Sequence, residues 1–286
     1  MAIKILTDST CDLPESVIRD LGIKVVPLYI NIGDQGFLDG VEITRREFYT
    51  NLPGYKIHPT TGTPGSGAFV KAFDELTSQG ADQILTIHIS ESLSATVDVA
   101  RTSARDYKKI PVIVRDSGQL SLATGFQVEV AAKMAIAGKS MTEILTTLDD
   151  LKSRTFVAAG LNTLEYLRRS GRMNRFMTGI GSLIQLKPIL TMKNGQPGSD
   201  RVRTSIKAEN RLISLLEGYL PIERFALLHT NAQEKAEKFL TRISDLIPDE
   251  KIYSMDITPV IGAHIGPGAI GYAIISKRTV GGPAPV

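Results

Sequence analysis

The sequence has 286 residues, 42% of them hydrophobic and 22% charged, which is typical of a globular protein and long enough for two compact units. A single cysteine excludes an internal disulfide and a cysteine-based metal cage, and the four histidines lie at unrelated spacings, so we expect no metal and no cofactor. Because we find no signal peptide and no apolar run of membrane-spanning length, we expect a cytoplasmic protein without an integral membrane segment.

The net charge of +3 conceals an uneven distribution. Between Arg154 and Arg211 there are 11 Lys and Arg against 3 Asp and Glu, a local charge of 11 − 3 = +8. Few aromatic residues are interleaved with these charges, so we expect no nucleic-acid partner. A surface for an acidic partner or a phosphate is the functional interpretation, and an ordinary solvated basic surface is the alternative.

The first half of the chain alternates predicted strands with predicted helices. The predicted strands are Ile3–Leu6, Val25–Ile32, Ile84–Ile89 and Ile110–Val114. The predicted helices are one capped by Asp12 with Pro14 in its first turn, one beginning after Thr44, Phe69–Thr77, one through Val99 and Ala100, Leu120–Ala137, and one capped by Ser140 with Glu143. This alternation predicts a doubly wound, mostly parallel α/β domain over residues 1–153.

Two hydroxyl-rich turns precede helices in this domain. The first spans Thr60 to Gly67, and the second spans Ser90 to Thr96 after a predicted strand. Backbone N–H groups at a helix N-terminus favour anions, and turns at the carboxyl ends of parallel strands are common ligand sites. The first turn lacks the Gly-Lys-Ser/Thr ending of a nucleotide-binding P-loop. An anion site and a simple capped helix start therefore both remain open here.

The second half predicts a mixed sheet with helices, an α/β domain over residues 154–278. Its predicted strands are Thr155–Leu161, a hairpin of Ile189–Met192 with Arg201–Thr204, Phe225–His229, Lys251–Ile257 and Tyr272–Ser276. Its predicted helices are a short one ending at Ser170-Gly171, Arg172–Leu186, Ser205–Leu216 and Ala232–Leu246. The Gly- and Pro-rich tail, residues 279–286, is predicted to be disordered.

A glycine-rich segment between the last two predicted strands contains His264. Gly266, Gly268 and Gly271 match the spacing of the dinucleotide fingerprint, but that fingerprint requires a helix after it, and here the residues from Tyr272 favour a strand. We therefore reject dinucleotide binding and predict a glycine-lined turn that presents His264. A structural turn with an incidental histidine is the alternative.

Several different short motifs occur along the chain in a specific order. They are Thr7-Asp8-Ser9-Thr10-x-Asp12-Leu13-Pro14, Asp39-Gly40-x-x-Ile43-Thr44, Thr60-Thr61, Leu93-Ser94-x-Thr96, Asp116-Ser117, Tyr166-Leu167-x-x-Ser170-Gly171-Arg172, Lys187-Pro188-Ile189-Leu190, Arg201-x-Arg203-Thr204 and Gly262-x-His264-x-Gly266-Pro267-Gly268-x-x-Gly271. In this order and spacing they resemble the DegV family over nearly the whole chain.

The resemblance implies a two-domain α/β protein that holds one long-chain fatty acid between its domains and has no catalytic residues of its own. It implies that Thr61, Ser94 and His264 bind the carboxylate. It also implies a partner, the catalytic subunit of a bacterial fatty acid kinase, which forms an acyl phosphate for phospholipid synthesis. The expected docking residues for that partner are the exposed basic side chains Arg169, Arg172, Arg201 and Arg203.

Two other functions stay open at this stage. The first is a serine esterase or thioesterase that uses Ser94 with His264 and an acid such as Asp8 or Asp116, although the chain has no Gly-x-Ser-x-Gly elbow. The second is a protein that binds a small phosphorylated ligand at the same hydroxyl-rich turns. This second function requires a polar pocket, whereas a fatty acid requires an apolar one.

Overall fold

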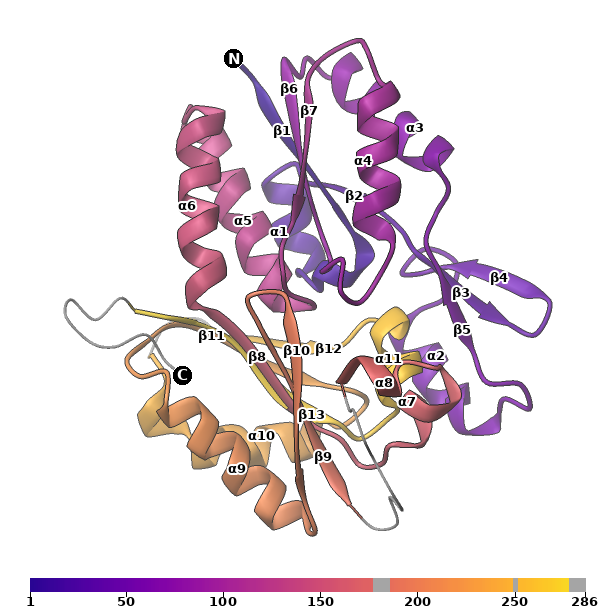
Figure 1. The fold of residues 1–286 in the computed structure, drawn as a ribbon, viewed down its shortest axis with the longest axis vertical. Helices are drawn as coiled ribbons and strands as arrows, with labels where there is room; N and C mark the ends of the chain where they lie inside the picture. Colours follow the sequence, from indigo (N-terminus) through magenta and orange to yellow (C-terminus); the bar gives the residue numbers. More distant parts are fainter. Residues whose placement is uncertain (177–185, 249–251, 278–286) are drawn as a thin grey trace.

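The computed structural model describes residues 1–176, 186–248 and 252–277. Within these ranges the strands form three sheets, and Figure 1 shows the two larger ones in separate parts of the molecule. The first part comprises the helices and strands up to Arg154, and the second part comprises those from Thr155 onwards. We name them the N-terminal part and the C-terminal part. The mixed α/β architecture agrees with the predicted fold class.

The N-terminal part is built on a four-stranded parallel sheet with the order β2-β1-β6-β7. Its strands are β1 (Ile3–Asp8), β2 (Lys24–Val26), β6 (Gln83–His88) and β7 (Val112–Asp116). Its helices are α1 (Glu15–Asp20), α3 (Ser66–Ser78), α4 (Thr96–Asp106), α5 (Leu122–Ile136) and α6 (Met141–Arg154). Leu6 packs towards α3 and α4, whereas Ile5 packs towards α5, because successive side chains of a strand point to opposite faces.

The C-terminal part is built on a six-stranded sheet with the order β10-β9-β8-β13-β11-β12, in which β11 and β12 are parallel and the other neighbours antiparallel. Its strands are β8 (Thr155–Gly160), β9 (Lys187–Lys193), β10 (Gln196–Val202), β11 (Ile222–His229), β12 (Tyr253–Asp256) and β13 (Ile270–Ser276). One face packs on α9 (Ser205–Glu217) and α10 (Gln233–Arg242). The other face shares a continuous apolar core with α5 of the N-terminal part.

A small three-stranded antiparallel sheet, β4-β3-β5, projects from the N-terminal part (Figure 1). Its strands are β3 (Tyr29–Ile32), β4 (Gln35–Leu38) and β5 (Thr60–Gly62), and α2 (Arg45–Asn51) lies beside it. The single predicted strand Val25–Ile32 was therefore wrong, because β2 ends at Val26 in the parallel sheet and β3 begins at Tyr29 in another sheet. Pro27 stands between them, and proline cannot donate a hydrogen bond to a strand ladder.

Two predicted elements after residue 171 are corrected. Helix α7 (Glu165–Arg169) agrees with the prediction, but α8 covers Met173–Phe176, and residues 177–185 of the predicted helix lie outside the described residues. Leu186 is not helical, and the basic strand ends at Val202. Arg203 therefore follows β10 and does not share a strand face with Arg201.

The segment before His264 forms a helix, α11 (Pro259–Ile265), and not the predicted turn. The hydroxyl of Thr258 accepts a bond from the N–H of Val260, and Pro259 occupies the first helical turn, both of which are helix start signals. Gly266 ends the helix with φ of 73°, a left-handed conformation that glycine adopts without strain. The pattern around Gly266 and Gly268 dominated the prediction, and the Thr-Pro start signal was missed.

The described residues also contain three short 3₁₀ helices, η1 (Ser9–Cys11), η2 (Leu52–Gly54) and η3 (Ser244–Leu246). Among the described helices, none combines the length and the apolar character needed to cross a membrane. The predicted disordered tail, residues 279–286, lies outside the described residues. The domain boundary between residues 153 and 154 stays a prediction, although α6 ends at Arg154 and β8 begins at Thr155.

Candidate functional site

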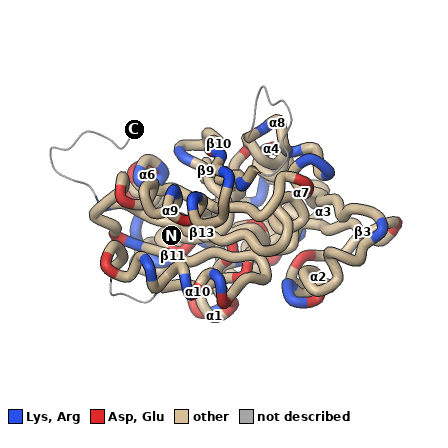
Figure 2. The backbone as a smooth tube through the Cα atoms, turned by 90° about the horizontal axis from the view of Figure 1, so that it is seen from below, with Lys and Arg blue, Asp and Glu red and all other residues tan. Residues whose placement is uncertain are grey.

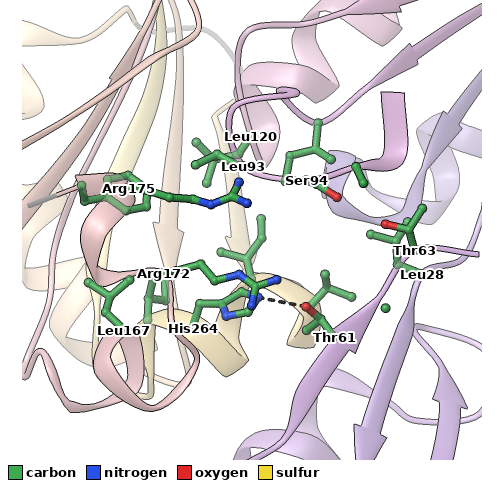
Figure 3. Close-up of a pocket in the computed structure, with 17 residues that line it drawn as sticks. Leu28, Thr61, Thr63, Leu93, Ser94, Leu120, Leu167, Arg172, Arg175 and His264 are labelled. Atoms are coloured by element: carbon green, nitrogen blue, oxygen red, sulfur yellow. Dashed lines mark hydrogen bonds between the residues drawn. The ribbon is translucent and has the colours of Figure 1, made fainter. Parts of the chain in front are cut away.

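A cavity of about 220 Å³ lies where the N-terminal and C-terminal parts meet (Figure 3). The N-terminal part contributes residues near β5 and the turn before α4, and the C-terminal part contributes residues from α7, α8 and α11. Thr61, Ser94 and His264, the three predicted carboxylate-binding residues, all line it. The structure thus brings together three side chains from distant parts of the sequence.

Thr61 and His264, which both line the cavity, form a hydrogen bond that joins the two parts. The distance from Thr61 Oγ1 to His264 Nε2 is 3.0 Å (Figure 3). Strand β5 positions Thr61 by pairing it with Ile30, and α11 positions His264 at its last turn. The pair therefore depends on the alignment of α11 with the small three-stranded sheet.

His264 is held as a neutral imidazole. Burial, together with the positive charges of Arg172 and Arg175, lowers the pKa of His264 to about 3. Its Nδ1 is buried without a hydrogen-bond partner among the described residues. A buried polar atom without a partner is costly, so the ring has an unused capacity for hydrogen bonding beside the cavity.

Ser94 ends the turn before α4 and points into the cavity opposite His264 (Figure 3). Its Oγ accepts a hydrogen bond from the N–H of Thr96 at 3.3 Å and lies 2.8 Å from the hydroxyl of Thr96. The hydroxyl of Thr63, another lining residue, lies 3.4 Å from that of Thr96. This wall of the cavity therefore carries a chain of hydroxyl groups that can donate to an anion.

Two arginines, Arg172 and Arg175, give this end of the cavity a positive charge (Figure 3). Arg172 donates to the carbonyl of Ser170 at 2.8 Å, and Arg175 donates to the carbonyl of Ser92 at 2.6 Å. Neither forms an ion pair within the described residues, and Nε of Arg172 is buried without a partner there. Burial and the nearby Arg175 lower the pKa of Arg172. Such guanidinium groups favour an anionic ligand.

Towards Ile261 and Ile265 the cavity is apolar, and it adjoins a second compartment of about 40 Å³. The two compartments share four apolar lining residues, Leu120, Phe176, Ile261 and Ile265. Beyond these, the second compartment is lined by Ser121, Val157, Ala159, Leu161, Leu190, Thr191, Leu228 and Ile257. A ligand with a charged head and a long apolar body matches this combination.

Sequence analysis singled out Thr61, Ser94 and His264 in the cavity lining, but not Arg175 or the apolar residues. Arg175 follows Arg172 by three residues, a spacing that places two side chains on one face of a helix and that could have found it. The apolar lining residues carry no comparable signal, because they are ordinary core residues in a sequence. Arg172, predicted at the docking surface, lines the cavity.

The other predicted docking residues lie outside the cavity lining. Arg169 is exposed on α7, where it and Arg168 both pair with Glu165. Arg201 on β10 and Arg203 after it are exposed, and neither forms an ion pair within residues 1–176, 186–248 and 252–277. Basic positions recur along β9 and β10 and near α8 (Figure 2).

The geometry does not assemble a hydrolytic triad from the described residues. His264 Nε2 bonds to Thr61, and the hydroxyl of Ser94 lies against Thr96. Asp8 Oδ2 lies 2.9 Å from Nδ1 of His88, and Asp116 accepts the N–H of Gly118 at 2.8 Å, so both candidate acids have other partners. Within the described part of the chain, no group of three or more His, Cys, Asp or Glu residues could hold a metal ion.

Comparison with known proteins identifies related chains along almost the whole length. The model of the DegV family, described as uncharacterised, matches residues 2–277. The DegV domain-containing protein lin2658 of Listeria innocua is 32% identical over 273 residues, which cover 94% of this chain and 96% of that protein.

Two solved structures are also closely similar to this chain. One is a DegV family protein of Thermus thermophilus described by its fatty acid binding, with a TM-score of 0.88, 31% identity, and coverage of 97% of this chain and 100% of that one. The other is DegV of Bacillus subtilis, described as a fatty acid-binding protein, with a TM-score of 0.88, 30% identity and the same coverage.

Proposed function

Because the chain belongs to the DegV family, we propose that it is a cytoplasmic carrier that binds one long-chain fatty acid and catalyses no reaction itself. The carboxylate lies among Thr61, Ser94 and His264, and the acyl chain extends past Ile261 and Ile265 into the apolar compartment. The observation that carries this proposal is the cavity itself, which is hydroxyl-lined and cationic at one end and apolar at the other. The fatty acid binding described for the two structural relatives supports it.

The energetics of the two ends agree with this ligand. Burying each methylene contributes roughly 0.8 kcal/mol, so a palmitate-length chain gains on the order of 10 kcal/mol before ordering costs. The carboxylate loses its hydration when it is buried, and this loss is offset by hydrogen bonds from the hydroxyls and by the positive charge of Arg172 and Arg175. A small phosphorylated ligand would leave the apolar compartment unfilled.

We further propose that the bound carboxylate is presented to a partner, the catalytic subunit of a fatty acid kinase, for acyl-phosphate formation. Ser94 and Arg175 line the cavity near exposed positions such as Ala95, so a protein that approaches this side comes close to the carboxylate. The positive charge at this end also suits a group that gains negative charge on phosphorylation. Arg169, Arg172, Arg201 and Arg203 are the basic residues we propose for docking.

Mass spectrometry of the purified protein tests the carrier proposal. Organic extraction is expected to release a near-stoichiometric long-chain fatty acid, and delipidated protein is expected to take up added palmitate. Delipidated protein that binds neither palmitate nor oleate would contradict the proposal. A hydrolysis assay on a chromogenic acyl ester, comparing the wild type with Ser94→Ala, tests the esterase alternative, and we expect no activity that depends on Ser94.

A further inference from the structure

Asp12 lies at a junction between the N-terminal and C-terminal parts of the molecule. It follows η1, it is 1% exposed, and its φ of 55° is a left-handed conformation that is strained for a residue other than glycine. The sequence predicted that Asp12 caps α1. That prediction was wrong, because the residue before α1 is Pro14 and no side chain caps this helix.

The carboxylate of Asp12 instead holds three segments that are distant in sequence. Its Oδ1 accepts the N–H of Thr258 at 2.9 Å and pairs with the guanidinium of Arg45 at 3.0 Å. Its Oδ2 accepts the hydroxyl of Ser121 at 2.6 Å. Thr258 is the residue before α11, and Ser121 precedes α5 and lines the apolar compartment. Asp12 therefore links the start of α11 to a residue that lines the apolar compartment.

The residues immediately before α11 are all held by side chains of the N-terminal part. Arg45 donates to the carbonyl of Asp256 at 2.5 Å, and the hydroxyl of Tyr49 donates to the carbonyl of Ile257 at 2.9 Å. The N–H of Thr258 then bonds to Asp12, and its hydroxyl donates to the buried carboxylate of Asp39. Three consecutive residues thus fix where α11 begins and in which direction it runs.

The head-group site depends on this alignment because its donors come from two parts of the molecule. Thr61 and Ser94 belong to the N-terminal part, whereas His264 stands six residues after Thr258 on α11. A hydrogen bond weakens steeply when its geometry is lost, and the 3.0 Å contact between Thr61 and His264 spans this boundary. A small shift of α11 would separate the donors that must converge on one carboxylate.

We propose that Asp12 is a positioning residue for the head-group site, which holds α11 so that His264 meets Thr61 and Ser94 around the ligand carboxylate. The inference rests on the proposed binding of a fatty acid. It assigns to Asp12, together with its partner Arg45, a specific effect on head-group recognition. Contact between Asp12 and the ligand is not required.

A matched control is needed because Asp12→Asn also breaks a buried ion pair and thereby destabilises the fold. Glu129 on α5 provides that control: it is 3% exposed, and its Oε2 pairs with Arg224 on β11 at 2.6 Å. This pair also joins the N-terminal and C-terminal parts, but neither residue lines either compartment. Glu129→Gln therefore reproduces the loss of a buried ion pair between the two parts, and the Gln side-chain oxygen can still accept the hydroxyl of Tyr253 on β12, which lies 3.3 Å from Glu129 Oε2.

The experiment compares the binding of dodecanoate and dodecanol to the delipidated wild type, Asp12→Asn and Glu129→Gln. We expect Asp12→Asn to lower dodecanoate affinity about tenfold, the order expected when a buried hydrogen-bonding arrangement is lost, and to change dodecanol affinity by less than about twofold. Glu129→Gln is expected to keep the wild-type ratio of the two affinities, even where both variants lose similar thermal stability.

A second readout follows the imidazole of His264 directly. We expect the ¹⁵N signals of His264 to shift in Asp12→Asn and to stay near their wild-type positions in Glu129→Gln. Should Asp12→Asn not fold, Ser121→Ala removes a single donor from Asp12 and is expected to shift the same signals. An unchanged ratio and unchanged signals in a folded variant would overturn the inference, whereas a wild type that binds neither ligand would instead overturn the proposed function.

Discussion

The head end and the apolar end of the cavity are built by different means. The head end collects polar side chains from separate segments, and it exists because the N-terminal and C-terminal parts are aligned at α11. The apolar end is one face of a sheet: Val157, Ala159 and Leu161 alternate with Phe156 and Ala158, which face the opposite core. If the cavity binds a fatty acid as proposed, recognition of the carboxylate depends on alignment between the two parts. Accommodation of the chain depends on apolar packing, contributed mostly by the C-terminal part, with Leu120 and Ser121 from the N-terminal part.

The largest expected effect comes from filling the apolar end. Ala159 lines the second compartment from β8, so Ala159→Leu occupies space that we propose for the end of the acyl chain. Excluding several methylenes at roughly 0.8 kcal/mol each predicts a loss of on the order of 100-fold in palmitate affinity. Isothermal titration with delipidated protein measures this loss.

The same variant also provides its own control. A shorter acid such as octanoate does not need the second compartment, so we expect its affinity for Ala159→Leu to match the wild type. Equal losses for both acids would show that the substitution disturbs the sheet, and that the two ends are not separable in this way.

The second prediction removes the imidazole from the head end. His264→Ala takes away a donor to a buried carboxylate, which is expected to cost roughly 1–3 kcal/mol in fatty acid affinity. Dodecanol, which has no charge to stabilise, is expected to lose much less. If acid and alcohol lose affinity equally, His264 serves only to pack α11. That result would contradict a head end that recognises the charge of the ligand.

The same contrast explains what could be predicted from the sequence. Ile5 and Leu85 are buried in the same hydrophobic core. They belong to short apolar segments that alternate with helical patterns, and this alternation predicts the parallel sheet. Thr61, Ser94 and His264 could be found because short motifs surround them. Their convergence could not be derived from the residues, because it depends on contacts between residues more than 200 positions apart, such as Asp12 with Thr258.

Other failures arose where one local signal competed with another. The glycines after His264 favoured a turn, although Thr258 and Pro259 carry the start signal of α11. Asp12 matched a helix cap by position, but its carboxylate bonds to Thr258 and Ser121 instead. The start of α11 was therefore readable from a local signal that was missed, whereas the role of Asp12 depends on long-range contacts, which a single sequence does not record.

The third prediction concerns pH in the delipidated protein. The pKa of His264 is lowered to about 3 from its ordinary 6.5, so below pH 6.5 the unfolded chain takes up a proton that the folded protein does not. The free energy of unfolding is therefore expected to fall as pH decreases from 6.5 towards 3. Between pH 6.5 and pH 5 this amounts to about 1.6 kcal/mol relative to His264→Gln, which cannot be protonated.

Urea denaturation of both proteins at the two pH values measures this difference. Burial raises the pKa of Asp12 to about 6, which contributes stability at acid pH that is lost as pH rises through that value, the opposite sign. Because Asp12 is present in both proteins, its contribution cancels in the comparison. A difference between the two proteins that does not vary with pH would show that His264 takes up a proton in the folded protein as readily as in the unfolded chain, which contradicts a lowered pKa.

The smallest expected effect lies outside the cavity, at the proposed docking surface. Arg203 is exposed, and it forms no ion pair in the described part of the chain, so charge reversal there is expected to leave stability and palmitate affinity within about 0.5 kcal/mol of the wild type. Lys71→Glu on α3 changes the net charge equally at an exposed position in the N-terminal part, and it serves as the control.

If a kinase subunit docks on the basic surface, Arg203→Glu is expected to slow kinase-coupled phosphorylation of bound palmitate by about tenfold at low salt, because complementary charges act mainly on the rate of encounter. Raising the salt concentration should lower the phosphorylation rate of the wild type and thereby narrow its difference from the rate of Arg203→Glu. The rate of Lys71→Glu should stay close to that of the wild type at every salt concentration. Arg172 is unsuitable for this test, since it lines the cavity and its replacement would also act on the ligand. Equal rates for Arg203→Glu and Lys71→Glu would show that the partner does not dock at Arg203. The boundary between the two parts would then serve ligand binding and not partner docking.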